Sequence, residues 1–112
     1  MIFWDHISGD YTVESELLWT GQRGLFITRT TNPTYLYLKA PGKKVGAMLW
    51  VVLDPDTNAS YHLRVYGSPT QAVIKPSATN YFACNNARST AYFMATDENT
   101  WTMYESGLFY AL

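Results

Sequence analysis

Short runs in which hydrophobic and polar residues alternate make up most of this chain. In residues 61–66, Leu63 and Val65 fall on one side of an extended chain, while His62 and Arg64 fall on the other. Residues 91–96 alternate in the same way. A period of two is typical of a strand with one buried face, so both segments are predicted to be β-strands.

Clusters of turn-forming residues interrupt these runs about every eleven residues, and all five prolines lie in such clusters. Proline has no amide hydrogen for a sheet ladder, so its absence from the intervening runs supports their assignment as strands. Short strands at this spacing predict an all-β fold, namely an antiparallel sandwich, jelly-roll-like, with about eight short strands. No linker or shift of composition divides the chain, so residues 1–112 are predicted to form a single domain.

Two segments depart from the simple alternation. Residues 45–53 are apolar on both faces, which indicates a central strand covered on each side, or a strand buried edge to edge by another subunit. Residues 10–19 favour a strand, but Val13, Leu17 and Leu18 also fit a short helix that ends at Gly21.

The composition limits the classes of function. Aromatic residues make up 16% of the chain and charged residues only 15%, against about 25% in an ordinary soluble domain. A net charge of −1 without a basic run excludes non-specific binding of nucleic acid through a basic surface. A single cysteine excludes a disulfide framework. The longest apolar stretch is too short to cross a bilayer as a helix, and the first residues do not resemble a secretory leader, so no membrane association is expected.

Candidate chemistry is sparse. Residues 54–58 place oxygen-bearing side chains at alternate positions, but Ala59 and Val65 stand where a calcium loop needs a glycine and a carboxylate. Neither His62 nor Cys84 lies in a nucleophile motif, although a small hydrolase that pairs His62 with an acid or with Cys84 stays an alternative. We therefore expect no catalytic residue, no metal and no cofactor.

The strongest binding signal lies on one predicted strand. If Leu36 and Leu38 point inward, then Tyr35, Tyr37 and Lys39 share the other face, where they can stack on a sugar, fill an interface or lie under a second sheet. Large apolar residues also gather at both ends, where each end is either a strand or an arm packed on a neighbouring subunit. The candidate interface residues at the ends are Ile2, Phe3, Trp4, Phe109 and Tyr110.

With few charges, abundant threonine, asparagine and tyrosine, and apolar ends, the chain resembles the small all-β structural proteins of tailed-phage virions, of the capsid cement or decoration type. The resemblance lies in overall style, without a diagnostic motif. It implies a non-enzymatic protein, made in the host cytoplasm and located in the virion, that stabilises the shell through contacts with the major capsid protein or another virion protein. It also implies a homo-oligomer, with a trimer favoured. A carbohydrate-binding or lectin-like module is the alternative.

Overall fold

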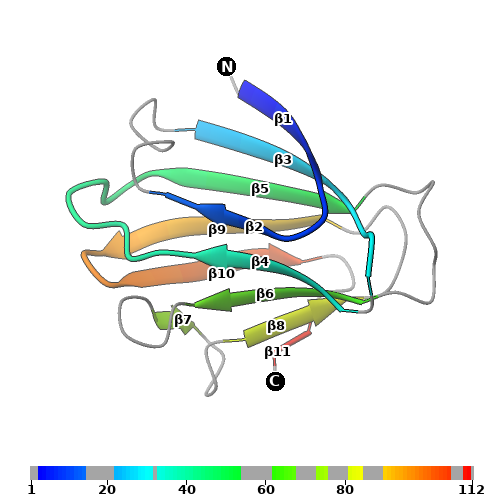
Figure 1. The fold of residues 1–112 in the computed structure, drawn as a ribbon. Coiled ribbons are helices and arrows are strands. Elements are labelled where there is room, and N and C mark those ends of the chain that lie inside the picture. Colours follow the sequence, from blue (N-terminus) through cyan, green and yellow to red (C-terminus); the bar gives the residue numbers. More distant parts are fainter. Residues whose placement is uncertain are drawn as a thin grey trace.

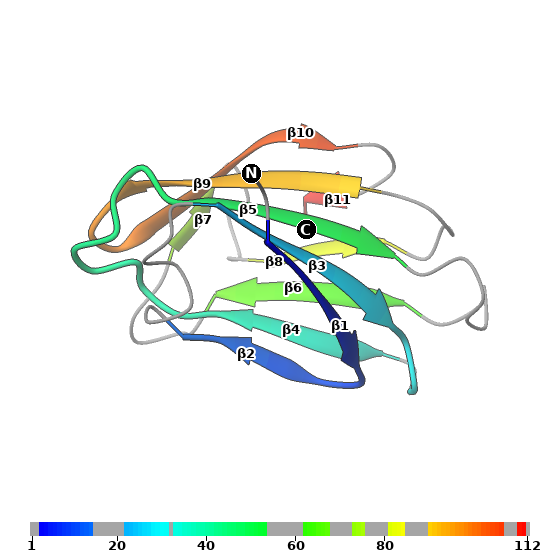
Figure 2. The ribbon, with the colours of Figure 1, turned by 90° about the horizontal axis from the view of Figure 1, so that it is seen from above.

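The structure is a computed structural model, and it describes residues 3–14, 22–31, 33–53, 62–67, 73–75, 81–84, 90–106 and 110–111. Every regular element in these ranges is a β-strand (Figure 1). The prediction of an all-β fold is therefore confirmed. The strands form two sheets, which appear as two layers in Figure 2.

The larger sheet, sheet A, contains six of the described strands. Its order is β1 (Phe3–Ser8), β3 (Gln22–Thr28), β5 (Met48–Leu53), β9 (Thr90–Asp97), β10 (Thr100–Ser106) and β7 (Val73–Lys75). Sheet B contains the other five, in the order β11 (Tyr110–Ala111), β8 (Tyr81–Cys84), β6 (Leu63–Gly67), β4 (Thr34–Leu38) and β2 (Tyr11–Val13). The described ends of the chain are thus strands at a sheet edge, β1 in sheet A and β11 in sheet B.

The chain changes sheet after almost every strand. The odd-numbered strands from β1 to β7 lie in sheet A and the even-numbered strands from β2 to β8 lie in sheet B. Each circuit brings the chain back to a sheet in its previous direction, so β1, β3 and β5 are parallel, as are β2, β4 and β6. Among the described strands, only β9 and β10 follow one another within a sheet, as an antiparallel pair.

The prediction of an antiparallel arrangement is wrong for most of the described pairings. Five strand pairs are parallel and four are antiparallel. Turn-forming residues show where the chain reverses, but they do not show whether it re-enters the same sheet or crosses to the other. Parallel neighbours need a long crossover, usually a helix, and here a strand of the opposite sheet serves as that crossover. The described residues contain eleven strands, more than the estimate of about eight, and within residues 10–19 the favoured strand is present as β2.

Local chemistry fixes the crossings between sheets. Gly9 follows β1 with φ of 83°, a conformation that residues with a side chain rarely adopt, and its amide donates to the carbonyl of Thr28 at 3.0 Å. At the crossing from β3 to β4, the buried hydroxyl of Thr34 accepts from the amide of Thr30 at 3.1 Å and donates to the carbonyl of Thr31 at 2.9 Å. These bonds satisfy backbone groups that have left one sheet ladder and not yet joined the next.

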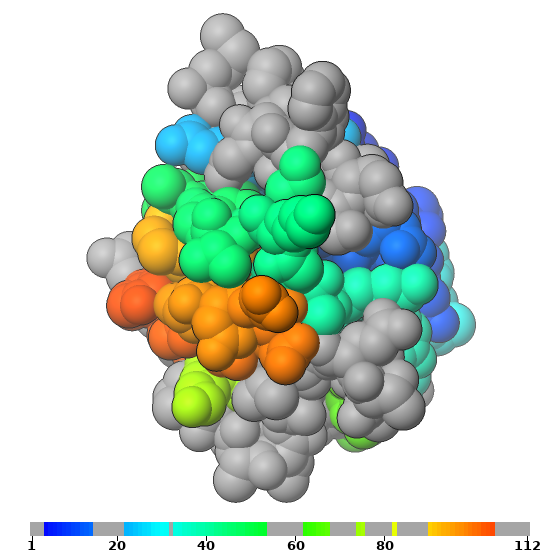
Figure 3. Space-filling view, turned by 90° about the vertical axis from the view of Figure 1, so that its left-hand side faces the viewer, coloured from blue at the N-terminus to red at the C-terminus, as the bar shows by residue number. Residues whose placement is uncertain are grey.

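The crossing that precedes β5 closes one end of the molecule. The loop of residues 41–47 lies against the turn between β9 and β10, and the two segments are in contact in Figure 3. The amide of Gly42 donates to the carbonyl of Glu98 at 2.9 Å, and the amide of Gly46 donates to the carbonyl of Ala95 at 2.8 Å. This end carries charges of both signs, from Lys43, Lys44, Asp97 and Glu98.

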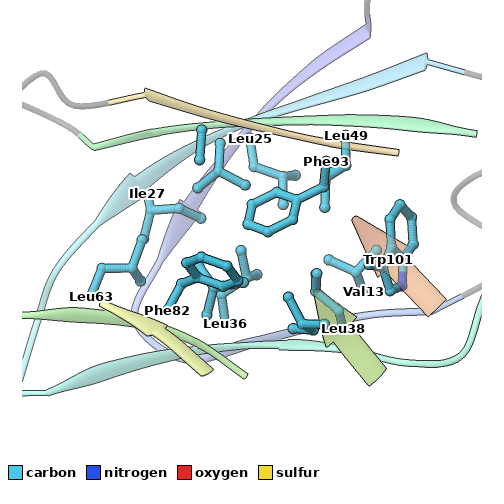
Figure 4. Close-up of a cluster of buried hydrophobic side chains, with 14 of the residues drawn as sticks. Val13, Leu25, Ile27, Leu36, Leu38, Leu49, Leu63, Phe82, Phe93 and Trp101 are labelled. Atoms are coloured by element: carbon cyan, nitrogen blue, oxygen red, sulfur yellow. The ribbon is translucent and has the colours of Figure 1, made fainter. Parts of the chain in front are cut away.

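The inner faces of the two sheets form one core (Figure 4). Alternate residues of each strand point inward, as the pattern of residues 61–66 and 91–96 predicted, and Phe82 of β8 meets Phe93 of β9 edge to face at 6.0 Å. The fully buried members of highest volume are Leu25, Ile27, Leu36, Leu38, Leu49, Leu53, Leu63, Ile74, Phe82, Phe93 and Trp101.

Trp101 connects the two sheets by a polar bond as well as by packing. Its side chain is fully buried, and its indole Nε1 donates to the backbone carbonyl of Lys39, just beyond β4, at 2.9 Å. Because a buried indole N–H needs an acceptor, this bond determines where β10 lies over the end of β4.

Replacing Trp101 by phenylalanine is expected to lower the free energy of unfolding by about 2–3 kcal/mol, because it leaves a void and removes the donor from a partly buried carbonyl. Urea denaturation measures the change. Tyr104→Phe on the same strand is the control, since Tyr104 is 58% exposed and its substitution should change stability by no more than about 0.5 kcal/mol. Equal losses in the two variants would contradict the role given to Trp101.

Candidate functional site

The outer face of sheet A carries three rows of side chains across its strands. The register places Trp4, Gly24, Trp50 and Tyr92 in one row, which continues to Glu105 of β10. The row on one side holds His6, Phe26, Val52 and Thr90. The row on the other side holds Gln22, Met48, Met94 and Thr102, and it continues to Lys75 of β7. We call Trp4, His6, Gly24, Phe26, Met48, Trp50, Val52, Tyr92 and Met94 the aromatic face.

The rings of the aromatic face pack mainly on one another. Trp4 lies 4.8 Å from Phe26, and His6 stacks on the same ring with a centroid distance of 5.1 Å. Trp50 meets Tyr92 edge to face at 4.4 Å. Each of these side chains keeps part of its surface open, and Trp4 is 42% exposed.

The outward positions of β1, β3, β5 and β9 carry no aspartate, glutamate, lysine or arginine. A sheet whose second face meets water usually alternates apolar and polar residues, and parallel sheets are usually covered on both faces. Here the parallel strands β1, β3 and β5 expose an apolar face that no other described element of the chain covers. The face therefore has the composition of a buried layer.

The sequence pattern indicated the part of the aromatic face that lies on β5, but not the parts on the other strands. Residues 45–53 were predicted to be a central strand with both sides covered, and β5 is indeed central, between β3 and β9. Its strand begins at Met48, however, and Met48, Trp50 and Val52 are only partly buried. The apolar pattern on both faces was the only signal that pointed to these residues, and Phe26, Tyr92 and Met94 gave none on their own.

Trp4 lies directly over Gly24, its neighbour in the register. A Cβ atom built on Gly24 would approach the indole to 2.3 Å, closer than any real contact. The missing side chain on β3 therefore makes room for an aromatic ring from the edge strand β1, which covers an otherwise bare stretch of backbone. This contact gives Gly24 a specific function in holding β1.

Gly24→Ala is expected to displace Trp4 and to lower the free energy of unfolding by about 1–3 kcal/mol. In a Trp4→Ala background the same substitution should be neutral or stabilising by up to about 1 kcal/mol, because alanine loses less backbone entropy than glycine on folding. Urea denaturation of the four proteins in this double-mutant cycle measures the coupling. The same loss in both backgrounds would show that Gly24 is needed for some reason other than Trp4.

The outer face of sheet B has a different character. Tyr35 and Tyr37 of β4 lie with ring centroids 5.5 Å apart and planes 11° apart, and Tyr37 meets Tyr66 of β6 edge to face at 6.2 Å. His62 and Arg64 also lie outward here, beside β4. We call Tyr35, Tyr37, Lys39, His62, Arg64 and Tyr66 the tyrosine face.

The structure brings Tyr35, Tyr37 and Lys39 together on one side of β4, with Leu36 and Leu38 in the core, as the alternation predicted. The three are half-buried, so the alternative in which they lie under a second sheet does not apply. Lys39 forms an ion pair with Glu14 at 3.2 Å. Burial raises the pKa of the Tyr37 phenol above 10.0, with smaller contributions from the negative charge of Asp10 and from the neighbouring tyrosines.

The remaining candidate residues are only partly placed. Trp4 is a surface residue of the edge strand β1, while Phe3 and Tyr110 belong to β1 and β11 by their backbones alone. Ile2 and Phe109 lie outside the described residues, as do residues 54–58, the predicted turn with calcium-like spacing. The arm alternative for the two ends therefore stays a prediction.

The hydrolase alternative stays a prediction, because the side chain of Cys84, its candidate nucleophile, lies outside the described part of the structure. The two histidines lie on opposite outer faces, His6 in the aromatic face and His62 in the tyrosine face. No group of three histidine, cysteine, aspartate or glutamate side chains comes together among the described residues to hold a metal ion. Within the same ranges, no helix is long and apolar enough to span a bilayer.

Comparison with known proteins gives no family for this chain. Neither the family models nor the curated proteins that were searched match it. The two outer faces of the sheets are the features of this chain that point to a function.

Proposed function

We propose that this chain is a non-enzymatic structural protein that works by binding protein surfaces. The aromatic face is the observation that supports this proposal. It joins three aromatic rings from β3, β5 and β9, two methionines and Val52 with Trp4 of the edge strand, and no charged side chain lies among them. A broad apolar sheet face suits another protein surface, whereas a small ligand needs a concave site.

The energetics favour such a contact. Covering apolar surface stabilises a complex by roughly 25 cal/mol per Å², and tryptophan and tyrosine are the residues that most often dominate binding energy. Because no aspartate, glutamate, lysine or arginine stands on the face, covering it does not require the desolvation of an ion.

The assembly we propose is a tailed-phage virion, in which the protein acts as a capsid cement or decoration protein. The low charge, the abundant threonine and tyrosine and the resemblance in style support this location. Its partner is the major capsid protein or another virion protein, and the chain itself forms a homo-oligomer. For the fold, we propose a two-sheet sandwich in which the chain alternates between the sheets. This arrangement differs from a jelly roll, because jelly rolls are built from antiparallel strands.

The test is co-sedimentation with shells assembled from the major capsid protein of the same genome. The intact chain should pellet with the shells, and Trp50→Lys should weaken binding by about 2 kcal/mol or more, because it places a charge in the centre of the contact. Tyr66→Lys is the matched control, since Tyr66 is also a half-buried ring but lies on sheet B. An intact chain that fails to bind, or a Trp50→Lys variant that binds as well as the intact chain, would remove the proposal.

A carbohydrate-binding module is the second candidate, and the tyrosine face is what favours it. Tyr35, Tyr37 and Tyr66 place ring surfaces and hydroxyls beside Arg64 and His62. Sugars are bound by rings that stack on their C–H faces and by polar side chains that bond to their hydroxyls. The tyrosine face offers both kinds of group, while the aromatic face offers few hydrogen-bonding groups.

For this second candidate, the intact chain should be retained on affinity gels that carry chitin, β-glucan or mannan. Tyr35→Ala combined with Tyr37→Ala should abolish retention and change the melting temperature little, because both rings are outward-facing. Trp50→Lys is the control and should be retained. If the intact chain passes through all three gels, the carbohydrate function is wrong, and a large loss of stability in the double variant would give the rings a structural role instead.

A further inference from the structure

We propose that the free edge of β1 pairs with β1 of a second copy of this chain, so that the two strands run antiparallel about a two-fold axis through His6. The pairing joins the two copies of sheet A into one continuous sheet. The inference deepens the proposed function, because it names the contact that holds the homo-oligomer together. It rests on that function only for what the joined sheet binds.

β1 is the one long strand at an edge of the described sheets. It has six residues, whereas the other edge strands, β2, β7 and β11, have two or three. In Figure 1, β1 is the uppermost strand of sheet A, and no other described strand pairs with its upper side. Short edge strands are one means by which proteins keep their sheets from joining. Of the described edges, β1 is therefore the one at which a full strand can be added.

β1 also lacks other features that protect sheet edges. It contains no proline and no lysine, and its pairing with β3 has no bulge. Its single charged residue, Asp5, lies on the inner side of the sheet, where it forms an ion pair with Arg23 at 3.0 Å. The backbone donors and acceptors along this edge are therefore open to another strand.

The aromatic face reaches this edge without a border of charge. Two of its rows end at Trp4 and His6 of β1, and Trp4 is 42% exposed. In the opposite direction the rows reach the charged residues Glu105 of β10 and Lys75 of β7. An apolar surface that runs up to an open strand edge is best continued by a strand with uncharged outward residues, and β1 of a second copy is such a strand.

The hydrogen-bond pattern shows which residues would form the contact. The amide of Gly9 donates to the carbonyl of Thr28 on β3 at 3.0 Å. Because the backbone groups of successive residues alternate between the two sides of a strand, the odd-numbered residues of β1 bond to β3. The even-numbered residues, Trp4, His6 and Ser8, therefore direct their amides and carbonyls to the free edge.

A two-fold axis through His6 matches this edge with itself. His6 then lies opposite its own copy, and Trp4 lies opposite Ser8 of the second copy, a large side chain beside a small one. Each such pair exchanges two hydrogen bonds, about six in all. Moving the axis to Asp5 would place two carboxylates opposite each other, which is unfavourable. Moving it to Ile7 would keep only about four of the bonds.

The joined sheet also changes the contact with a shell. The two-fold axis stands perpendicular to the sheet, so both aromatic faces lie on the same side of the dimer. Two linked faces bind a repetitive surface more tightly than one, because the second contact forms within a complex that already exists.

The first experiment is sedimentation equilibrium of the intact chain at concentrations from micromolar to millimolar, where a reversible monomer–dimer equilibrium is expected. His6→Pro should raise the dissociation constant about thirtyfold or more, because it removes the central amides of the contact but no bond of the β1–β3 ladder. His6→Lys, which sets like charges opposite each other, is a second edge variant. His62→Lys on sheet B is the matched control and should leave the dimer unchanged. Circular dichroism identifies any variant that does not fold.

The second experiment tests the register by disulfide formation in a Cys84→Ala background. His6→Cys should give a covalent dimer on air oxidation, because the two Cα atoms of such a pair lie about 5.5 Å apart, within the range of a disulfide. Ser8→Cys is the matched control. The same axis places it about 13 Å from its own copy, so it should stay uncrosslinked.

A chain that stays monomeric at millimolar concentration overturns the inference, and so does a trimer, because one strand edge accepts one partner. A dimer that survives both His6 variants, or that is lost in His62→Lys, also overturns it. So does a disulfide that forms in Ser8→Cys but not in His6→Cys. The shell assay separates the inference from the proposed function. A monomer that binds shells through Trp50 leaves the structural role without the dimer, and a β1-paired dimer that does not bind shells leaves the dimer without the virion role.

Discussion

A chain of this length can build one layer of buried side chains, and the rest of the molecule depends on how that layer is filled. The layer lies between the two sheets, where alternate residues of every long strand meet and where Trp101 bonds to the backbone of the opposite sheet. Nearly half of the residues are hydrophobic and few are charged, so this layer cannot hold all of them. The surplus lies on the outer faces, and mainly on that of sheet A.

The two outer faces therefore serve different chemistry. On sheet A the rings contact one another and no charged side chain stands among them, so this surface is suited to an apolar interface from which water is displaced. On sheet B the rings lie beside an ion pair, a guanidinium and an imidazole, so this surface is suited to hydrogen-bonded contacts, direct or through water. A protein with two such faces can hold one neighbour by burial and a different one by hydrogen bonds.

Sequence reasoning was reliable where it depended on the period of two. It placed Leu36 and Leu38 on one side of their strand and Tyr35 and Tyr37 on the other, because neighbouring side chains of a strand must alternate, but it left open whether the tyrosines are exposed. It failed on strand direction, because a turn motif carries no information about which sheet receives the next strand. Only pairing partners distant in sequence bring Trp4, Gly24 and Trp50 into one row, so the aromatic face could not be predicted from any local pattern.

The repeated change of sheet also affects the order in which the chain can fold. Each of the first eight strands has its hydrogen-bonded neighbours at least one full circuit away in sequence, so among the described strands only β9 and β10 complete a ladder within a short segment. Folding dominated by such distant pairings is slow, since loops must close before contacts stabilise them. During synthesis, sheet A gains its antiparallel half only when β9 and β10 emerge, and until then its apolar strands stay open to water. Apolar strands exposed in this way favour aggregation between unfinished chains.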